Sequence, residues 1–351
     1  MNQTISTFTI IMYSSLYKPA IIDLLKGMWA EYGESGRYEL FQWRYENNPY
    51  KKPVIFLATE NNNVIGFRAF ISQIFIKNEK EYFVFSPSDT YIHREHRRKG
   101  IISALNDKCM EELNKLYNNN NTILINTSTS KPSMPVYLKQ NWQKSNGLRR
   151  FYFKFSLLNL VNNNFKQKVS DNAFFVKDNN KIEVTPEVRS TELSSFNLKI
   201  RNPKRWSNIR DEKFFKWRYS LQSEKYTCVY CYNDKELQGY LIIKKVNDKQ
   251  GAIDQFETIN DKIFNLMIKA AFRKLGLVQL RSYAFLPEEK KLLSECGFIA
   301  EPVYLLEKFG RLRFPVLVRP LNLQPEDKDF IVDGNDIRDI NNWHLQVSDR
   351  H

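Results

Sequence analysis

The chain of 351 residues contains one six-residue block twice, and this repeat limits its fold more than any other feature. Leu40-Phe-Gln-Trp-Arg-Tyr45 returns as Phe214-Phe-Lys-Trp-Arg-Tyr219. Each block precedes an apolar strand pattern, a polar turn and a second strand that opens on a glycine, Gly66 in the first copy and Gly239 in the second. Because a repeated order of elements marks a duplicated structural unit, the sequence predicts two similar domains.

The length agrees with two domains, since an ordinary domain holds roughly 100–200 residues. Between the copies, the stretch from about residue 156 to 196 is rich in Asn, Lys and Ser and lacks sustained periodicity at first, which is typical of a boundary. We therefore expect an N-terminal domain over residues 1–160 and a C-terminal domain over residues 161–351.

Hydrophobic periodicity in the first copy alternates between strand and helix patterns. Strands are expected at 8–12, 54–59, 64–74, 82–92, 123–126 and 149–155, and helices at 19–33, 101–116 and 134–140. This order predicts a mixed α/β (α+β) sheet that combines antiparallel meanders with a parallel crossover.

The formal net charge of +14 favours anionic ligands such as nucleic acid, a membrane surface or phosphate-rich small molecules. The sequence contains no helix-turn-helix, zinc-finger or RNP motif, so no nucleic-acid partner is expected. No apolar stretch reaches the 18–20 residues or so that span a bilayer, and no Lys or Arg precedes Lys18 as in a signal peptide. We expect a cytoplasmic protein without a membrane span.

No metal site is expected from the cysteines. Cys228-Val-Tyr-Cys231 has CxxC spacing, but it lies within a strand pattern with no second CxxC or paired histidine nearby. Residues three apart in a strand point to opposite faces of the sheet, so this pair is poorly placed to chelate a metal ion.

A strongly basic turn joins the expected strand at 82–92 to the helix at 101–116. It reads Tyr91-Ile-His-Arg-Glu-His-Arg-Arg-Lys-Gly-Ile-Ile-Ser103. The first turn of a helix offers unpaired N–H groups and the positive end of the helix dipole, and Gly100 lets a phosphate approach the backbone. The turn is therefore a predicted pyrophosphate cradle, although its spacing fits neither a Walker A loop nor a GxGxxG fingerprint.

Residues 97–102, Arg-Arg-Lys-Gly-Ile-Ile, resemble the Arg/Gln-x-x-Gly-x-Gly/Ala signature of the GNAT acyltransferases, except that Ile102 replaces a small residue. In that family the loop binds the pyrophosphate of coenzyme A through its backbone amides. The resemblance implies acyl-CoA as co-substrate and assigns cofactor binding to Ile92, Arg97, Arg98, Lys99, Gly100, Ile101, Ile102 and Ser103.

The stretch from Asn126 to Trp142 resembles a second family motif, N…S…Y-x-K-x-G-F/W, with Asn141 in place of the usual glycine. By resemblance, Asn126 and Ser133 belong to the cofactor site and Tyr137 stands near the thioester sulfur. A phenol has an ordinary pKa of about 10, which suits a general acid for a departing thiolate. Alternatively, Tyr137 is only an aromatic residue on a short amphipathic helix.

The acceptor amine must lose a proton during acyl transfer, which requires a carboxylate, a histidine or a water chain. Asp89, near the end of the strand that leads into the cradle, is the first candidate base, and His93 is the second. Each has a structural alternative: Asp89 could fix a bulge, and His93 could simply be exposed.

The second copy lacks both motifs. Asn260-Asp-Lys262 before its long helix reads as a helix cap and not as a phosphate loop, and Leu293 stands where Tyr137 stands in the first copy, five residues before Phe298. We therefore expect two tandem GNAT-like domains, the second degenerate and serving as a scaffold or for acceptor binding.

The whole arrangement is similar to bacterial tandem-GNAT proteins of surface polysaccharide synthesis, including lipopolysaccharide O-antigen. This resemblance implies transfer of an acetyl or hydroxybutyryl group to a nucleotide-linked amino sugar, such as a dTDP-3-amino-3,6-dideoxyhexose. Trp43, Arg44 and Tyr45 are the acceptor-side candidates, with a core role as the alternative. Two other hypotheses remain: a tandem-GNAT aminoacyl or peptidyl transferase of cell-wall type, and a basic nucleic-acid-binding protein.

Overall fold

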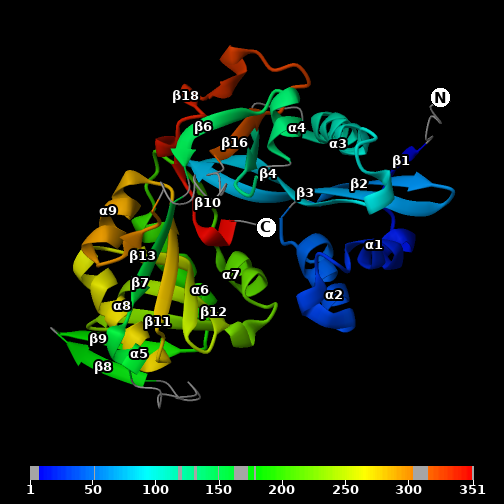
Figure 1. Ribbon diagram of the computed structural model, residues 1–351. Helices are drawn as coiled ribbons and strands as arrows, with labels where there is room; N and C mark the ends of the chain where they lie inside the picture. The colour runs from blue at the N-terminus through cyan, green and yellow to red at the C-terminus, as the bar shows by residue number, and fades with distance from the viewer. Residues whose placement is uncertain are drawn as a thin grey trace. The chain divides into compact units, whose positions relative to one another are not determined.

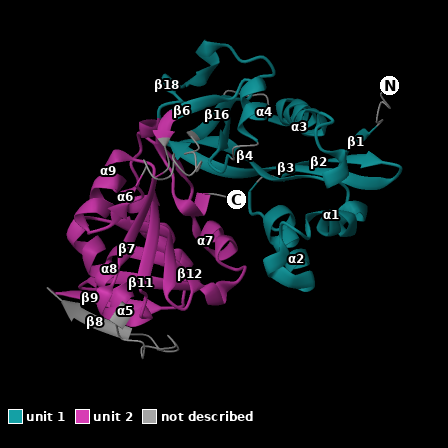
Figure 2. Ribbon diagram, in the orientation of Figure 1, with its two compact units in different colours: residues 1–145, 316–339, 351 teal, residues 146–315, 340–350 magenta. Residues whose placement is uncertain are grey.

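A computed structural model describes residues 8–50, 52–117, 121–129, 133–148, 150–161, 173–177, 179–302 and 315–349 (Figure 1). The chain forms two compact units (Figure 2). Unit 1 comprises residues 1–145, 316–339 and 351, and unit 2 comprises residues 146–315 and 340–350. Within the described residues, no helix combines the length and the apolar character that crossing a membrane requires.

Unit 1 is built on a mixed sheet with the strand order β1-β2-β3-β4-β5-β16-β6. Its strands β1 to β4 form an antiparallel meander, and β5 lies parallel to β4. The strands are β1 (Thr9–Met12), β2 (Val54–Glu60), β3 (Asn63–Lys77), β4 (Lys80–Ile92), β5 (Thr122–Asn126), β6 (Gln143–Leu148) and β16 (Pro315–Pro320). The predicted mixed α/β class is thereby confirmed.

The helices of unit 1 follow the expected pattern with one difference. They are α1 (Lys18–Leu25), α2 (Gly33–Phe41) with a following π-helical turn η3 (Gln42–Glu46), α3 (Ile101–Tyr117) and α4 (Met134–Lys139). The apolar stripe of α3, which includes Leu105, is buried against the sheet. Leu124 of β5 belongs to the same apolar cluster. The single helix expected at 19–33 is wrong, because α1 ends at Leu25 and Gly33 has a φ of +65°, outside the helical region.

Unit 2 repeats this plan with the strand order β15-β7-β14-β13-β12-β11-β9-β8. Its parallel pair is β13·β14. The strands are β7 (Arg150–Phe155), β8 (Ala173–Lys177), β9 (Asn180–Thr185), β11 (Tyr226–Asn233), β12 (Glu236–Asn247), β13 (Gln250–Thr258), β14 (Gln279–Ala284) and β15 (Ile299–Ala300). The main helices are α6 (Ser190–Ile200), α7 (Glu212–Arg218), α8 (Asp261–Leu275) and α9 (Pro287–Glu295).

The compact units differ from the domains expected at 1–160 and 161–351 in the placement of two strands. Strand β7 continues the first copy in sequence, yet it pairs with β14 of unit 2. Strand β16 follows the second copy in sequence, yet it pairs with β5 of unit 1. Each sheet thus contains a strand that was expected in the other domain, and strand pairing of this kind leaves no signal in local composition.

Both sheets have the same irregularity at the place where the long helix follows. Strands β4 and β5 pair only from Phe83↔Thr122 to Phe85↔Leu124, although β4 continues to Ile92. Strands β13 and β14 pair only from Gln250↔Gln279 to Ala252↔Arg281, although β13 continues to Thr258. The last residues of β4 and β13 therefore have a strand partner on one side only, within the described residues.

Candidate functional site

The basic turn before α3 has a backbone conformation that is suited to an anion. Arg98 and Gly100 both have left-handed conformations, with φ values of +66° and +77°. The first helical hydrogen bond of α3 runs from the Ala104 amide to the Gly100 carbonyl at 3.1 Å. The three preceding amides, at residues 101–103, therefore have no carbonyl within the helix to bond, and they stand at the positive end of its dipole.

The side chains of the turn add positive charge around these amides. Arg97, Arg98 and Lys99 are exposed, and the Arg97 Nε donates to the Ile92 carbonyl at 3.2 Å. A Cβ placed on Gly100 would meet no atom within 4 Å. Glycine therefore suits this position because of its left-handed backbone conformation, and not because of a tight contact. The side chain of Ile102 is half-buried. The backbone N–H of Ile102 still lies in the first helical turn of α3.

The repeated glycine explains how the helix start is held. A Cβ on Gly66 would lie 3.0 Å from the Ile92 side chain and 3.2 Å from that of Ile101. A Cβ on Gly239 would lie 3.1 Å from the Ile263 side chain, in the first turn of α8. In both units the missing side chain lets the start of the long helix lie directly on the sheet.

Tyr137 is buried in unit 1, with 5% of its surface exposed. Its hydroxyl accepts a hydrogen bond of 2.6 Å from the Arg68 Nη2. Arg68 lies on β3, is 2% exposed, and also donates to the Thr90 hydroxyl. Sequence reasoning missed Arg68, although an arginine within the apolar run Val64-Ile-Gly-Phe-Arg-Ala-Phe-Ile71 was a visible signal.

Local contacts fix the position of α4, which carries Tyr137. Gln140 donates to the Ser103 carbonyl at 3.3 Å and to the Asp107 carboxylate at 2.7 Å, and so ties α4 to the first turns of α3. Asn141 has a φ of +61°, a conformation that asparagine tolerates nearly as well as glycine. The Trp142 amide then donates to the Tyr137 carbonyl at 3.1 Å. The exchange of glycine for Asn141 thus preserves the turn.

The other residues assigned to the cofactor lie around the same end of the sheet. Ile92 is buried at the end of β4 beside Ile101 in the apolar core. Asn126 is buried at the end of β5, where its side-chain oxygen accepts from the Ser128 amide at 3.0 Å. Ser133 is half-buried and precedes α4 as its N-cap residue, without a side-chain capping bond. Their cofactor role stays a prediction.

Asp89 occupies a bulge, as its structural alternative predicted. The register of β3 and β4 shifts at this residue, whose φ is +32°. Its carboxylate forms an ion pair with Arg44 and accepts a 2.7 Å hydrogen bond from the Tyr45 hydroxyl. Burial lowers the pKa of Arg44. The negative charge of Asp89 has the largest opposing effect, and together with further neighbours it raises this pKa above its ordinary value. Burial raises the pKa of Tyr45 well above 10.

This network favours the core alternative for Trp43, Arg44 and Tyr45, whose acceptor-side role stays a prediction. The rings of Trp43 and Tyr45 are 8% and 3% exposed, and the Arg44 guanidinium pairs with Asp89. Their side chains therefore belong to the core of unit 1. Asp89 is likewise occupied by two donors, which disfavours it as a free base.

His93 is exposed just after β4, next to the cradle. Its ring lies 5.7 Å from that of His96. His93, Glu95 and His96 offer ligand atoms within 4.8 Å of one another and form a group that could hold a metal ion. His93 is exposed, as its structural alternative proposed, and its role as a base stays a prediction.

Unit 2 keeps the framework of this site but not its chemistry. The Phe298 amide donates to the Leu293 carbonyl at 2.9 Å, matching the bond between Trp142 and Tyr137. The side chain of Asn260 caps α8 by accepting from the Ile263 amide at 3.0 Å. On the free side of β13, the Gln346 side chain accepts from the Phe256 amide at 3.4 Å and donates to its carbonyl at 3.2 Å. The C-terminal segment thus covers this edge.

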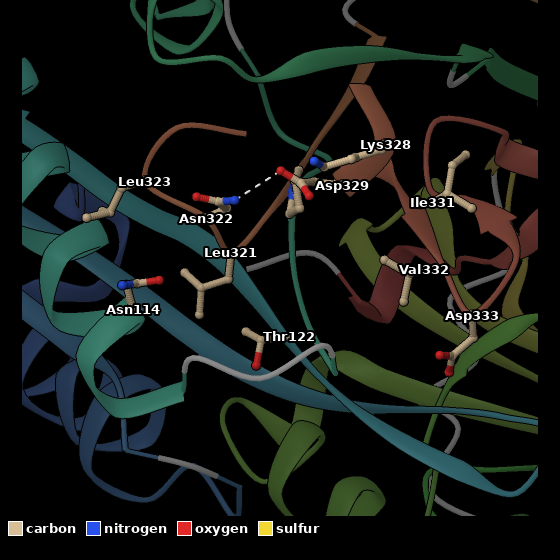
Figure 3. A pocket seen from close by; sticks show the side chains of 11 residues that line it. Asn114, Thr122, Leu321, Asn322, Leu323, Lys328, Asp329, Ile331, Val332 and Asp333 are labelled. Atoms are coloured by element: carbon tan, nitrogen blue, oxygen red, sulfur yellow. Dashed lines mark hydrogen bonds between the residues drawn. The ribbon is translucent and has the colours of Figure 1, made fainter. Parts of the chain in front are cut away.

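A separate pocket of about 540 Å³ lies in unit 1 (Figure 3). It is lined by parts of α3 and β5 and by the segment from Pro320 to Asp333, and the Asn322 side chain within it donates to Asp329 at 3.0 Å. None of the residues that line it was predicted to bind cofactor or substrate. Neither Tyr137 nor any residue of the basic turn lines this pocket.

Comparison with known proteins relates this site to a family. Residues 18–142 match the family model described as "Acetyltransferase (GNAT) family". No curated protein matches the chain in sequence.

Solved structures extend the likeness to both units. A protein of Enterococcus faecalis V583, described as a probable N-acyltransferase, is 11% identical, with a TM-score of 0.66 over 93% of this chain and 74% of its own. A tandem GNAT protein from the clavulanic acid biosynthesis pathway is 13% identical, with a TM-score of 0.54 over 92% of this chain and 100% of its own.

A third structure is the GCN5-related glucosamine N-acetyltransferase region of a fungal multi-domain GH3 β-N-acetylglucosaminidase. It is 12% identical, with a TM-score of 0.54 over 89% of this chain and 38% of its own. These likenesses confirm the fold of two tandem GNAT-like domains. The match over residues 18–142 identifies a GNAT acetyltransferase domain in this part of the chain, and acyl-CoA-dependent N-acyl transfer is the activity of that family.

Proposed function

We propose that unit 1 transfers an acyl group, acetyl or hydroxybutyryl, from acyl-CoA to the amine of a nucleotide-linked amino sugar in surface polysaccharide synthesis. The observation that carries the proposal is the combination of a left-handed, basic turn at Arg98 and Gly100 with the phenol of Tyr137. Gln140 links the helices that carry them. One element suits a pyrophosphate, and the other can give a proton to sulfur.

The transfer needs no enzyme nucleophile. The amine nitrogen attacks the thioester carbonyl carbon, the carbon–sulfur bond breaks with its electron pair on sulfur, and the phenolic proton of Tyr137 passes to sulfur. Burial raises the pKa of Cys109, the single cysteine in the sequence of unit 1, to about 12, so its thiol is neutral and poorly suited to form an acyl-enzyme. His93 remains the candidate that accepts the proton of the amine.

The acceptor class is supported by charge and by likeness. A net charge of +14 favours a substrate that carries phosphates. The glucosamine N-acetyltransferase region with the same fold acts on an amino sugar by its description. The burial of Trp43 and Tyr45 and the ion pair of Arg44 favour a core role for these residues, so we expect other side chains to take part in acceptor recognition.

The test is a thiol-release screen that pairs acetyl-CoA and hydroxybutyryl-CoA with a panel of nucleotide-linked amino sugars, such as dTDP-3-amino-3,6-dideoxyhexose. We expect turnover with at least one pair, and its loss in Tyr137→Phe. Binding of acyl-CoA without turnover on any amino sugar would overturn the acceptor class. Failure to bind acyl-CoA, with binding of charged tRNA instead, would favour the aminoacyl transferase hypothesis.

A further inference from the structure

Arg68 is a buried cation without an anionic partner in the described part of the chain. Its side chain is 2% exposed, and its hydrogen bonds go to two neutral hydroxyls, those of Thr90 and Tyr137. Its Nε has no hydrogen-bond partner among the residues that the structure describes. The guanidinium carbon lies 4.7 Å from the ring centre of Phe70 and 5.4 Å from that of Tyr137, so aromatic faces offset part of its burial.

Such an arrangement is costly for a folded protein. A charge removed from water needs a paired anion or complete hydrogen bonding, and here both are incomplete. Phe70 and Cys109 lie near the guanidinium, and neither of them offers a compensating charge. A buried cation of this kind is matched to an anion that the described residues of the resting protein do not supply.

Unit 2 shows that the fold itself needs neither Arg68 nor Tyr137. Arg68 stands two residues after Gly66, and Leu241 stands two residues after Gly239. Tyr137 corresponds to Leu293 by its turn geometry. Leu241 and Leu293 are both fully buried in the same apolar cluster of unit 2. The cation and the phenol are thus replaced together by two leucines.

The direction of the hydrogen bond leaves the phenolic proton available. The Arg68 Nη2 donates to the Tyr137 oxygen at 2.6 Å, so the hydroxyl of Tyr137 is the acceptor in this pair. Within the described residues, no group accepts the proton of this hydroxyl. The phenol can therefore donate its proton elsewhere while Arg68 stays bound to its oxygen.

We propose that Arg68 is a positioning residue that stabilises the phenolate formed when Tyr137 protonates the departing thiolate. This inference rests on the proposed function of Tyr137 as general acid. As the carbon–sulfur bond breaks, sulfur takes the electron pair and the phenolic proton, and the negative charge remains on the Tyr137 oxygen, next to the guanidinium. The anion that matches Arg68 then exists during the reaction only, and a proton from solvent restores the phenol. A charge held ready for a developing anion is a common source of catalysis.

A double-mutant cycle tests this coupling. Arg68→Met, Tyr137→Phe and the double variant are compared in thiol release at saturating acyl-CoA. We expect Arg68→Met to lower kcat by roughly 10–100-fold, with acyl-CoA affinity changed by less than about threefold. The double variant is expected within about threefold of Tyr137→Phe, because Arg68 acts through that phenol. Losses that multiply in the double variant would overturn the inference.

Two further measurements separate catalysis from folding. Arg68→Lys keeps a cation and is expected to recover part of kcat, and the alkaline limb of the pH–rate profile is expected to move to higher pH in Arg68→Met. The pair Arg68→Leu with Tyr137→Leu recreates the leucines of unit 2 and is expected to melt no lower than the unchanged chain, yet to be inactive while binding acyl-CoA.

The same experiments distinguish two kinds of failure. If the unchanged chain neither binds acyl-CoA nor releases thiol, the proposed function falls and the inference falls with it. If the unchanged chain turns over and Arg68→Met retains its kcat and pH profile, only the inference is overturned.

Discussion

Asp89 and Asp254 are each the bulged residue of the strand before the long helix in their own unit. Each accepts a hydrogen bond from a tyrosine of the repeated block, Tyr45 at 2.7 Å and Tyr219 at 3.1 Å. Each also pairs with the neighbouring arginine of that block. The arginine and tyrosine of the repeated block therefore hold the bulged aspartate of their unit in place.

Replacing either aspartate should destabilise its own unit. Asp89→Asn leaves the Arg44 guanidinium buried without its charge partner, which costs about 3–5 kcal/mol. Asp254→Asn should cost less, since Arg218 lies 3.4 Å from Asp254. Denaturant unfolding monitored by fluorescence measures both losses. A fully stable Asp89→Asn chain that has lost acyl transfer would instead support Asp89 as the catalytic base.

Arg98→Asn should weaken acyl-CoA binding while the fold is unchanged. Asparagine tolerates the left-handed backbone at φ +66°, so the change removes one cation and little else. We expect a roughly 3–10-fold rise in Kd, equivalent to about 0.7–1.4 kcal/mol, and a weaker dependence of binding on salt. Isothermal titration with CoA at two salt concentrations measures both. As a control, Lys262→Asn alters the helix start of unit 2 and should leave the Kd unchanged.

The stability of unit 2 should depend on pH through Glu257 and His344. Burial raises the pKa of Glu257 from 4.5 to about 8, against the lowering effect of Arg210. The folded state keeps a proton that the unfolded chain loses, so this group makes stability fall as pH rises from about 4.5 to about 8. Burial lowers the pKa of His344 from 6.5 to about 3, so stability also falls as pH drops from about 6.5 to about 3.

Glu257→Gln isolates the first effect. A neutral amide should be more stable than the native carboxylate at pH 8–9 by about 1–3 kcal/mol, and the advantage should shrink toward pH 5. Thermal unfolding across this pH range gives the difference. A constant difference at all pH values would show that Glu257 does not titrate in this window.

Gln346→Leu should destabilise unit 2 without affecting acyl-CoA binding. The amide bonds both backbone groups of Phe256 at the edge of β13, and an unpaired buried donor or acceptor costs about 1–3 kcal/mol. Hydrogen exchange at residues 254–258 should rise, while CoA affinity stays constant. Faster exchange in β4 of unit 1 instead would contradict the assignment of this segment to unit 2.

Local patterns predicted the elements of the fold well where periodicity was strong. The strands expected at 54–59, 64–74 and 82–92 correspond to β2, β3 and β4, and the helix at 101–116 corresponds to α3. The turn between β3 and β4 has positive φ values at Asn78 and Glu79. Strand β6 was not expected, because Gln143–Leu148 lacks an apolar alternation.

By itself, the sequence determined the duplication, the mixed sheets, the basic glycine turn before α3 and the loss of Tyr137 from the second copy. These depend on local spacing, which survives in a linear sequence. The tertiary structure decided which strands complete each sheet, that Arg44 and Tyr45 hold Asp89, and that Arg68 meets Tyr137. These relationships join residues up to 197 positions apart, as between Pro320 and Ile123, and depend on pairing and burial that no local pattern records.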